Sequence, residues 1–313
     1  MDVGAGLCVV VAVPTGQAML YDAGRGGDRC GNAVRELVLG RRSELVILSH
    51  SDVDHIRELP RILGENRATT IIHPGDPRGP ALVPVRAAIA GSGATVIDLS
   101  READRDALEL GHPFQLGAGT VTFIAGWHDG HETEGPGEGE LDGGPLNNAL
   151  SIVVRLEFGG HSVLLTGDSV GRLDNEPNSA CQYAERIMVE RAGTVPIDSD
   201  VLVGQHHGAN NSTSNCFIRA VSPDYVVFSA GHHFRHPRQA VVDRLVANGV
   251  DPTRIFRTDR GDNEGGSGNT REMLFGSLRG CHDQPGDDDV EIRLPANPSL
   301  PVRVSYRVPS TGC

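Results

Sequence analysis

Four side chains that can bind a metal ion occur within six residues, at His50, Asp52, Asp54 and His55. Imidazole nitrogen and carboxylate oxygen are ligands that suit zinc, manganese and iron. The run follows residues 44–48, an apolar stretch that predicts a short buried strand. Alternate residues of an extended turn point the same way, so His50 and Asp52 could share one ion while Asp54 and His55 face a second. The alternative is that the run only caps a surface helix.

Two further groups of polar residues follow other predicted strands. Asp168 comes after the sequence Val-Leu-Leu-Thr-Gly, where a carboxylate is costly unless it is paired or binds a cation. His206 and His207 follow the strand predicted at residues 200–204, and Gly208 lets the backbone turn tightly. A turn-forming aspartate and a hydrogen-bonded core histidine are the alternatives for these two positions.

The polar sequence at residues 210–214, Asn-Asn-Ser-Thr-Ser, is expected to open a helix. The free N–H groups of such a helix start can receive an anion such as phosphate, which makes Asn210, Ser212 and Thr213 candidate substrate-binding residues. An ordinary N-cap would explain the same residues.

Other histidines lie in predicted loops. A small basic island could contact a negatively charged leaving group or form a solvated loop, and it consists of His232, His233, Arg235, His236 and Arg238. His128 and His131 lie in a Gly- and Glu-rich segment at residues 126–144, where surface histidines are the expected outcome, although they might reach a metal ion.

The elements that must position these side chains alternate along the chain. Strands at 69–73 and 95–99 enclose a helix at 82–90, and strands at 150–158 and 162–165 flank a Gly-Gly-His turn. The polar clusters follow the ends of apolar strands, where loops converge in layered α/β folds. Further strands are predicted at 7–13, 18–21, 121–125, 225–229, 254–258 and 302–308, and further helices at 32–39, 55–63, 180–192 and 239–247.

The composition is that of a globular protein, with 38% hydrophobic and 22% charged residues. A net charge of −13 disfavours the binding of nucleic acid through a broad positively charged surface. A bound metal pair would reverse the sign of the charge locally. No apolar run is long enough to span a membrane. No signal-peptide pattern is visible, so the default expectation is a cytoplasmic protein, with an exported mature form as the alternative.

None of the six cysteines lies in a Cys-x-x-Cys pair, so a thiolate zinc site is not expected. An even number permits disulfides, and Cys281 with Cys313 could staple the C-terminal tail. Six free thiols are an equally good interpretation. We expect one domain over residues 1–280, followed by a tail at 281–313 that is disulfide-stapled or adds an edge strand.

Taken together, these residues resemble the metallo-β-lactamase superfamily and, more narrowly, the ComEC-type nuclease domains of competence proteins. Where that superfamily usually has HxHxDH, this chain has HxDxDH, as the ComEC-type branch does. The superfamily's histidine between this motif and the bridging aspartate is missing, and Asn147-Asn148 stand near its place, with His128 as a more remote candidate. The matching segments, in order, are DVGAG (2–6), LYDAG (20–24), LSHSDVDH (48–55), NN (147–148), LLTGDS (164–169), HHG (206–208), SAG (229–231) and HP (236–237).

The resemblance implies a four-layer αββα sandwich that holds two divalent metal ions, with zinc favoured over manganese. One ion would be bound by His50 and Asp52, and the other by Asp54 and His55. Asp168 would bridge the two ions, and His206 or His207 would complete the second site, with His206 preferred because it is nearer the strand end. The residues facing the substrate would be His236, Asn210, Ser212 and Thr213.

The resemblance also implies a metal-dependent hydrolase. Two adjacent ions would generate hydroxide at neutral pH, and Asp54 or Asp168 would orient it for attack on a phosphodiester. The substrate would be a small phosphoester or single-stranded nucleic acid, with no obligate protein partner. A lactamase, lactonase or thioester hydrolase on the same fold is the first alternative, and a metal-depleted binding module is the second.

Overall fold

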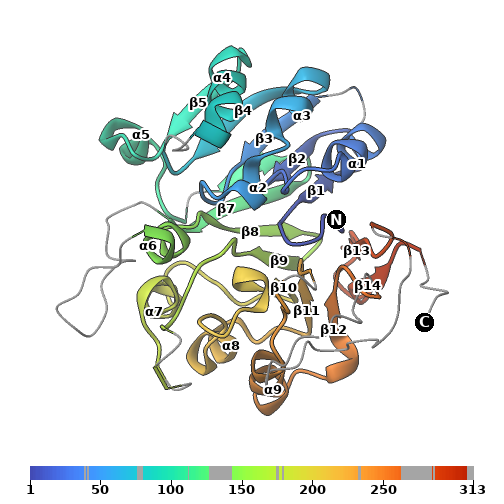
Figure 1. The fold of residues 1–313 in the computed structure, drawn as a ribbon. Coiled ribbons are helices and arrows are strands. Elements are labelled where there is room, and N and C mark those ends of the chain that lie inside the picture. The colour runs from blue at the N-terminus through green and yellow to red at the C-terminus, as the bar shows by residue number, and fades with distance from the viewer. Residues whose placement is uncertain are drawn as a thin grey trace.

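Two β-sheets form the centre of the molecule in the computed structural model (Figure 1). The structure describes residues 1–308 except 39, 41, 76–79, 112, 127–142, 174–175, 178–179, 232–233, 262–283 and 285. The first sheet has the strand order β1 (Val9–Ala12), β2 (Ala18–Tyr21), β3 (Arg42–Ile47), β4 (Arg67–His73) and β5 (Thr95–Asp98). The second has the order β12 (Ile255–Arg257), β11 (Tyr225–Phe228), β10 (Val201–Val203), β9 (His161–Leu165), β8 (Val153–Phe158), β7 (Gly119–Ala125) and β6 (Pro113–Leu116).

Strand side chains alternate between two apolar cores, as the two-residue period of a β-strand requires. Leu45 and Ile47 of β3 and Val201 and Val203 of β10 enter one core between the two sheets. The residues between them face the outer helices, for example Val46. The two sheets therefore pack face to face, with helices outside each.

The helices cover the outer face of each sheet, so the layer order is αββα and the predicted four-layer sandwich is confirmed. The first sheet is covered by α1 (Arg29–Leu37), α3 (Leu59–Glu65) and α4 (Val83–Gly91), and the second by α7 (Tyr183–Arg191), α8 (Asn215–Val221) and α9 (Gln239–Ala247). The short helices are α2 (Val53–Ile56), α5 (Glu102–Ala107) and α6 (Gly143–Ala149), and three 3₁₀ turns are η2 (Pro80–Leu82), η4 (Gln205–Gly208) and η5 (Pro252–Arg254).

Both sheets contain parallel strands, and their carboxyl ends carry the polar clusters. β2, β3 and β4 are parallel in the first sheet, and β9, β10 and β11 are parallel in the second. Because loops after parallel strands meet at one edge, residues far apart in sequence lie side by side there.

The helix predicted at residues 55–63 is instead two short helices, α2 and α3. Pro60 occupies the first turn of α3, where its missing N–H is harmless. A continuous helix would place the proline ring against the carbonyl of Ile56, so the break before Pro60 has a direct steric cause. Asp52 takes the N-cap position of α2.

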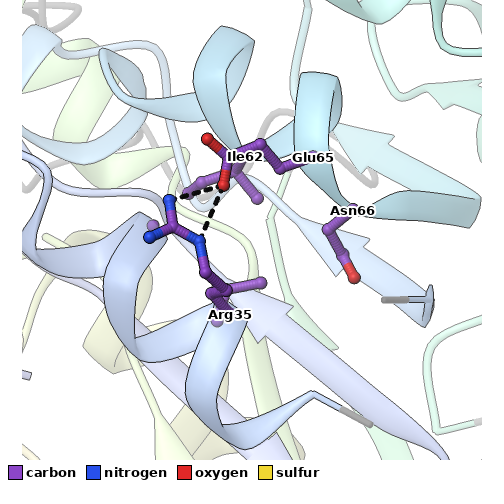
Figure 2. Close-up of a pocket in the computed structure, with 6 residues that line it drawn as sticks. Arg35, Ile62, Glu65 and Asn66 are labelled. Atoms are coloured by element: carbon purple, nitrogen blue, oxygen red, sulfur yellow. Dashed lines mark hydrogen bonds and ion pairs between the residues drawn. The ribbon is translucent and has the colours of Figure 1, made fainter. Parts of the chain in front are cut away.

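The outer helices of the first sheet are joined by an ion pair. Figure 2 shows Arg35 of α1 reaching Glu65 of α3 beside a small pocket that Ile62 and Asn66 also line. The Arg35 Nη2 to Glu65 Oε2 distance is 2.6 Å, and both side chains are about two-fifths exposed. An ion pair this exposed adds at most about 1 kcal/mol to stability.

The C-terminal tail forms a hairpin of β13 (Val290–Arg293) and β14 (Arg303–Tyr306). β14 pairs with β13 rather than with an edge strand of either large sheet. Ile292 and Val302 pack against the core between the sheets. The proposed boundary at residue 280 lies outside the described residues and stays a prediction.

Four cysteines form two disulfides, Cys8–Cys30 and Cys181–Cys216. The interpretation of six free thiols is therefore wrong for these four. Cys281 and Cys313, the pair predicted from the sequence, lie outside the described residues. Among the helices that the structure describes, none combines the length and apolar character needed to cross a bilayer.

Candidate metal centre

Asp168, just after β9, lies at the centre of a cluster of four imidazoles. Its Oδ1 atom is 3.2 Å from His55 Nε2 and 3.5 Å from His207 Nε2. Its Oδ2 atom is 3.8 Å from both His50 Nε2 and His206 Nε2. Three loops, after β3, β9 and β10, thus bring five predicted ligands together.

The two histidines after β3 are oriented by a buried carboxylate that follows β2. Asp22 Oδ2 lies 2.8 Å from His55 Nδ1, so it accepts that N–H. Asp22 also accepts hydrogen bonds from the Ser49 N–H and from Ser49 Oγ, at 2.7 and 2.6 Å. Ser49 Oγ lies 3.0 Å from His50 Nδ1. Because the Ser49 hydroxyl donates its hydrogen bond to Asp22, it acts as the acceptor toward that nitrogen. Both rings therefore turn Nε2 toward Asp168.

The two histidines after β10 are held in the same tautomer by different acceptors. His206 Nδ1 lies 2.8 Å from Asn211 Oδ1, and His207 Nδ1 lies 2.5 Å from the Ser229 carbonyl. Both residues have positive φ values, 47° and 56°. Each such conformation costs roughly 1–3 kcal/mol in a residue other than glycine. Strain of this size is typical of functional sites.

The geometry places several buried atoms that can bind a cation close together around Asp168. His55 Nε2 and His207 Nε2 are 3.2 Å apart, although each Nδ1 already carries the proton. His50 Nε2 and Asp168 Oδ1 are buried and accept or donate no hydrogen bond among the described residues. Buried polar atoms without partners are costly, and a divalent ion would satisfy all four atoms. The donor set therefore fits a metal pair.

The ligands divide into two groups around Asp168. Asp54, His55 and His207 offer ligand atoms that lie within 4.8 Å of one another, as do His50, His55 and Asp168. His207, and not the preferred His206, thus joins the group of Asp54 and His55. His207 lies deeper because its ring is anchored to Ser229, whereas His206 is turned toward Asn211.

Two asparagines of α6 occupy the region where the superfamily's third histidine was expected. Asn147 Nδ2 donates to Asp52 Oδ1. Asn148 Nδ2 lies 3.2 Å from His206 Nε2, on the side of Asp168 that also faces His50. His206 therefore lies where it can supply the imidazole that the sequence lacks. His128 lies outside the described residues.

The charges in the cluster favour a bound cation. Burial would raise the pKa of Asp168, but imidazolium charge on His207, His55 and His206 holds it well below its usual range. Burial would lower the pKa of His55, but Asp168 and Asp22 raise it well above its usual value. Burial lowers the pKa of His207. Asp168 is thus ionised at neutral pH, and a metal ion would compete with a proton on His55.

Two predicted substrate-binding residues are buried and serve the fold instead. Ser212 and Thr213 are 0% exposed. Ser212 Oγ lies 3.0 Å from the Gln205 carbonyl and 2.9 Å from the Ala209 carbonyl. Ser212 and Thr213 are therefore not placed to contact a substrate.

The predicted anion site at this helix start is filled by the protein itself. The carboxylate of Glu185, from α7, accepts hydrogen bonds from the backbone N–H groups of Thr213 and Ser214. From the other side, Arg244 of α9 donates to Asn210 Oδ1 at 3.0 Å and to the carbonyl of Ser212 at 2.8 Å. An internal carboxylate thus takes the place that the sequence analysis gave to phosphate.

Replacing Ser212 by alanine is expected to lower the free energy of unfolding by about 1 kcal/mol, because one buried hydrogen bond is lost. KM should not change, since the side chain has no access to a bound substrate. Denaturant unfolding and steady-state kinetics on the same preparation would check both numbers. A several-fold rise in the KM of Ser212→Ala at unchanged stability would instead support the sequence prediction that Ser212 binds the substrate.

His236 lies at the edge of the cluster. Its ring centroid is 6.2 Å from that of His206. Burial and the neighbouring His207 and His206 lower its pKa to about 3, so the ring is neutral above that pH. The sequence analysis placed His236 near the substrate, and its position beside His206 is compatible with that role. His232 and His233 lie outside the described residues.

Sequence reasoning assigned no positioning role to the residues that orient the imidazoles, although they lie in segments that it singled out: Asp22, Ser49, Asn211 and Ser229. Asp22 had a usable signal, because it is an acidic residue directly after an apolar strand, as Asp168 is. Ser49 directly precedes the metal-binding run. The carbonyl of Ser229 had no signal, since a backbone acceptor leaves no trace in the residue type.

The chain is similar to one known protein family and to several known proteins. The family model described as the metallo-beta-lactamase superfamily matches residues 1–232. Competence protein ComA of Neisseria gonorrhoeae is 38% identical over 115 residues, which are 36% of this chain and 14% of that protein. ComE operon protein 3 of Bacillus subtilis is 27% identical over 224 residues, 70% of this chain and 24% of that protein. Recombination protein 2 of Haemophilus influenzae is 28% identical over 253 residues, 78% and 26% of the two chains. The matches thus span between 14% and 26% of these relatives' lengths.

Proposed function

Given that the chain belongs to the metallo-beta-lactamase superfamily, we propose that it is a metal-dependent hydrolase that cleaves phosphodiester bonds, as a phosphodiesterase or nuclease. The observation that carries the proposal is the convergence of four imidazole Nε2 atoms on the Asp168 carboxylate. Each imidazole has its Nδ1 engaged by another group, which leaves Nε2 as the ligand atom. The Nε2 of His206 also lies 3.2 Å from Asn148 Nδ2, a contact that metal binding would replace.

We assign the ligands of two divalent ions from this geometry. Zinc is the first choice because imidazole nitrogens dominate the donor set, and manganese is the second. One ion would be held by Asp54, His55 and His207, the other by His50, Asp52 and His206, with Asp168 between them.

When bound, such ions lower the pKa of water and stabilise negative charge on a phosphoryl oxygen. Of Asp54 and Asp168, Asp54 is the better placed to orient an attacking water, because its side chain is 27% exposed whereas that of Asp168 is 6% exposed. The neutral ring of His236 can donate a hydrogen bond to a phosphoryl oxygen. The positions of Asp22, Ser49, Asn211 and Ser229 keep each imidazole from rotating during turnover.

Two observations support a phosphodiester substrate of limited size. The relatives are named competence and recombination proteins, and recombination is a reaction of DNA. The net charge of −13 disfavours a long duplex held by an extended basic surface. A short single strand or a small phosphodiester needs only the local charge of the metal pair.

The proposal predicts that protein loaded with Zn²⁺ or Mn²⁺ contains about two ions per chain and hydrolyses bis-p-nitrophenyl phosphate and single-stranded DNA. Nitrocefin and an acyl-lactone are the comparison substrates, because lactamases and lactonases share the fold. Phosphodiester turnover should exceed turnover of both. If the protein hydrolyses neither phosphodiester at full metal content, the proposal is wrong. Faster lactam or lactone turnover would move the activity to that class, and protein that takes up no metal would be a binding module.

A further inference from the structure

A second group of oxygen ligands lies outside the histidine-rich site. One carboxylate oxygen from each of Asp2, Asp287 and Asp288 lies within 4.8 Å of the other two. We propose that this acidic cluster, which joins the N-terminal segment to the segment just before β13, binds a structural divalent cation of the calcium type.

Burial is the first reason that the acidic cluster differs from an ordinary acidic surface. Asp2 and Asp288 are each 1% exposed. Asp288 Oδ2 is buried and receives no hydrogen bond from any residue that the structure describes. A buried carboxylate oxygen without a partner is costly, so it points to a ligand that supplies positive charge.

The positive groups near the cluster are Arg29, Arg260 and the N-terminal ammonium group. Arg29 Nη1 lies 3.6 Å from Asp2 Oδ1, with its side chain 31% exposed. The backbone N–H groups of Gly4 and Gly286 donate to Asp2. These groups orient Asp2 and partly offset its charge, but three carboxylates at this separation still repel one another.

The chemistry of the cluster selects calcium over the ions of the histidine-rich site. All three donors are oxygens, and Ca²⁺ accepts six to eight oxygen ligands at about 2.3–2.6 Å in a flexible arrangement. Oxygens that share one such ion lie at most about 5 Å apart, which the cluster satisfies. Zinc prefers nitrogen and sulfur donors, which the cluster lacks.

The acidic cluster is connected to the histidine-rich site through the N-terminal loop. The Leu7 N–H points to the Asp54 carbonyl at 3.4 Å. The Gly6 carbonyl accepts a hydrogen bond from Ser229 Oγ at 2.7 Å, and the Ser229 carbonyl holds His207. A cation bound by Asp2 would therefore fix the loop that contacts the ligand Asp54 and Ser229, the residue that holds His207.

Calcium binding should be measured on the full chain after treatment with a chelator. Millimolar CaCl₂ should raise the apparent Tm by roughly 2–5 °C, since only the folded state holds the ligands together. The Asp168→Asn variant, which disables the histidine-rich site, should keep this rise. Asp288→Asn should lose it, and without calcium it should be at least as stable as the unaltered chain because a buried repulsion is removed. If Asp288→Asn does not fold, the half-buried Asp287→Asn replaces it.

Three results would overturn this proposal: no calcium effect on the unaltered chain, a full effect in Asp288→Asn, or loss of the effect in Asp168→Asn alone. None of these readouts uses enzymatic activity, so they are separate from the test of the hydrolase.

Discussion

Replacing Asp168 by asparagine is expected to lower phosphodiester turnover by at least about 1000-fold, roughly 4 kcal/mol of transition-state stabilisation. Metal content should fall from two ions to one or fewer. The reason is that the Asp168 carboxylate faces all four imidazoles, and an amide removes both its charge and one of its acceptor oxygens. Steady-state kinetics with bis-p-nitrophenyl phosphate and elemental analysis of the same sample measure the two effects.

The fold should survive this substitution, because asparagine has the same shape and the backbone N–H of Asp168 keeps its bond to Ser151 Oγ. Asp224→Asn is the matched control, since the Asp224 side chain is 65% exposed and pairs only with the exposed Arg254 among the ion pairs described. It should change neither turnover nor metal content. An Asp168→Asn protein that keeps two ions and a tenth of the activity would show that Asp168 does not bridge them.

Replacing Asp22 by asparagine should weaken metal binding by about 10–100-fold, the usual effect of removing a carboxylate that orients a ligating histidine. Asp22 touches no substrate and acts by holding His55 and Ser49. Asparagine suits the test because it tolerates the positive φ of 58° at this position. Competition with a chromogenic chelator gives the affinity.

A positioning role for Asp22 predicts one further result that a purely structural role does not predict. Excess metal should restore most of the turnover of Asp22→Asn, and the concentration needed for half activity should move with the measured affinity. The Asp28→Asn variant, in an exposed acidic side chain of the same loop region, serves as the control. Unchanged metal affinity in Asp22→Asn would remove Asp22 from the site.

The layers and most of the ligands could be predicted because they depend on local patterns. The apolar runs of strands such as β3 and β10 predict that these strands are buried, and the polar residues that follow each run mark where the strand ends. The HxDxDH run and Asp168 were visible for the same reason. The loops after β9 and β10 converge by the rule that loops after parallel strands meet at one edge, but β3 belongs to the other sheet, and its loop reaches Asp168 because the two sheets pack face to face.

What could not be predicted depends on contacts between distant segments. Whether His206 or His207 lies beside Asp54 depends on the acceptors of the two rings. Asn211 holds the ring of His206, and the Ser229 carbonyl holds the ring of His207. The burial of Ser212 and Thr213 could not be predicted because it depends on Glu185, on another helix, which accepts from the N–H groups of Thr213 and Ser214. The cysteine pairing depends on Cα separations of 5.9 and 6.0 Å that no spacing in the sequence encodes.

The most direct test of the metal-centre assignment is anomalous diffraction from crystals of the protein grown with Mn²⁺ or Zn²⁺. We expect two anomalous peaks, one on each side of Asp168, with His207 and His55 bound to one ion and His50 bound to the other. Crystals soaked to saturation that show no peak within bonding distance of the Asp168 carboxylate would contradict it.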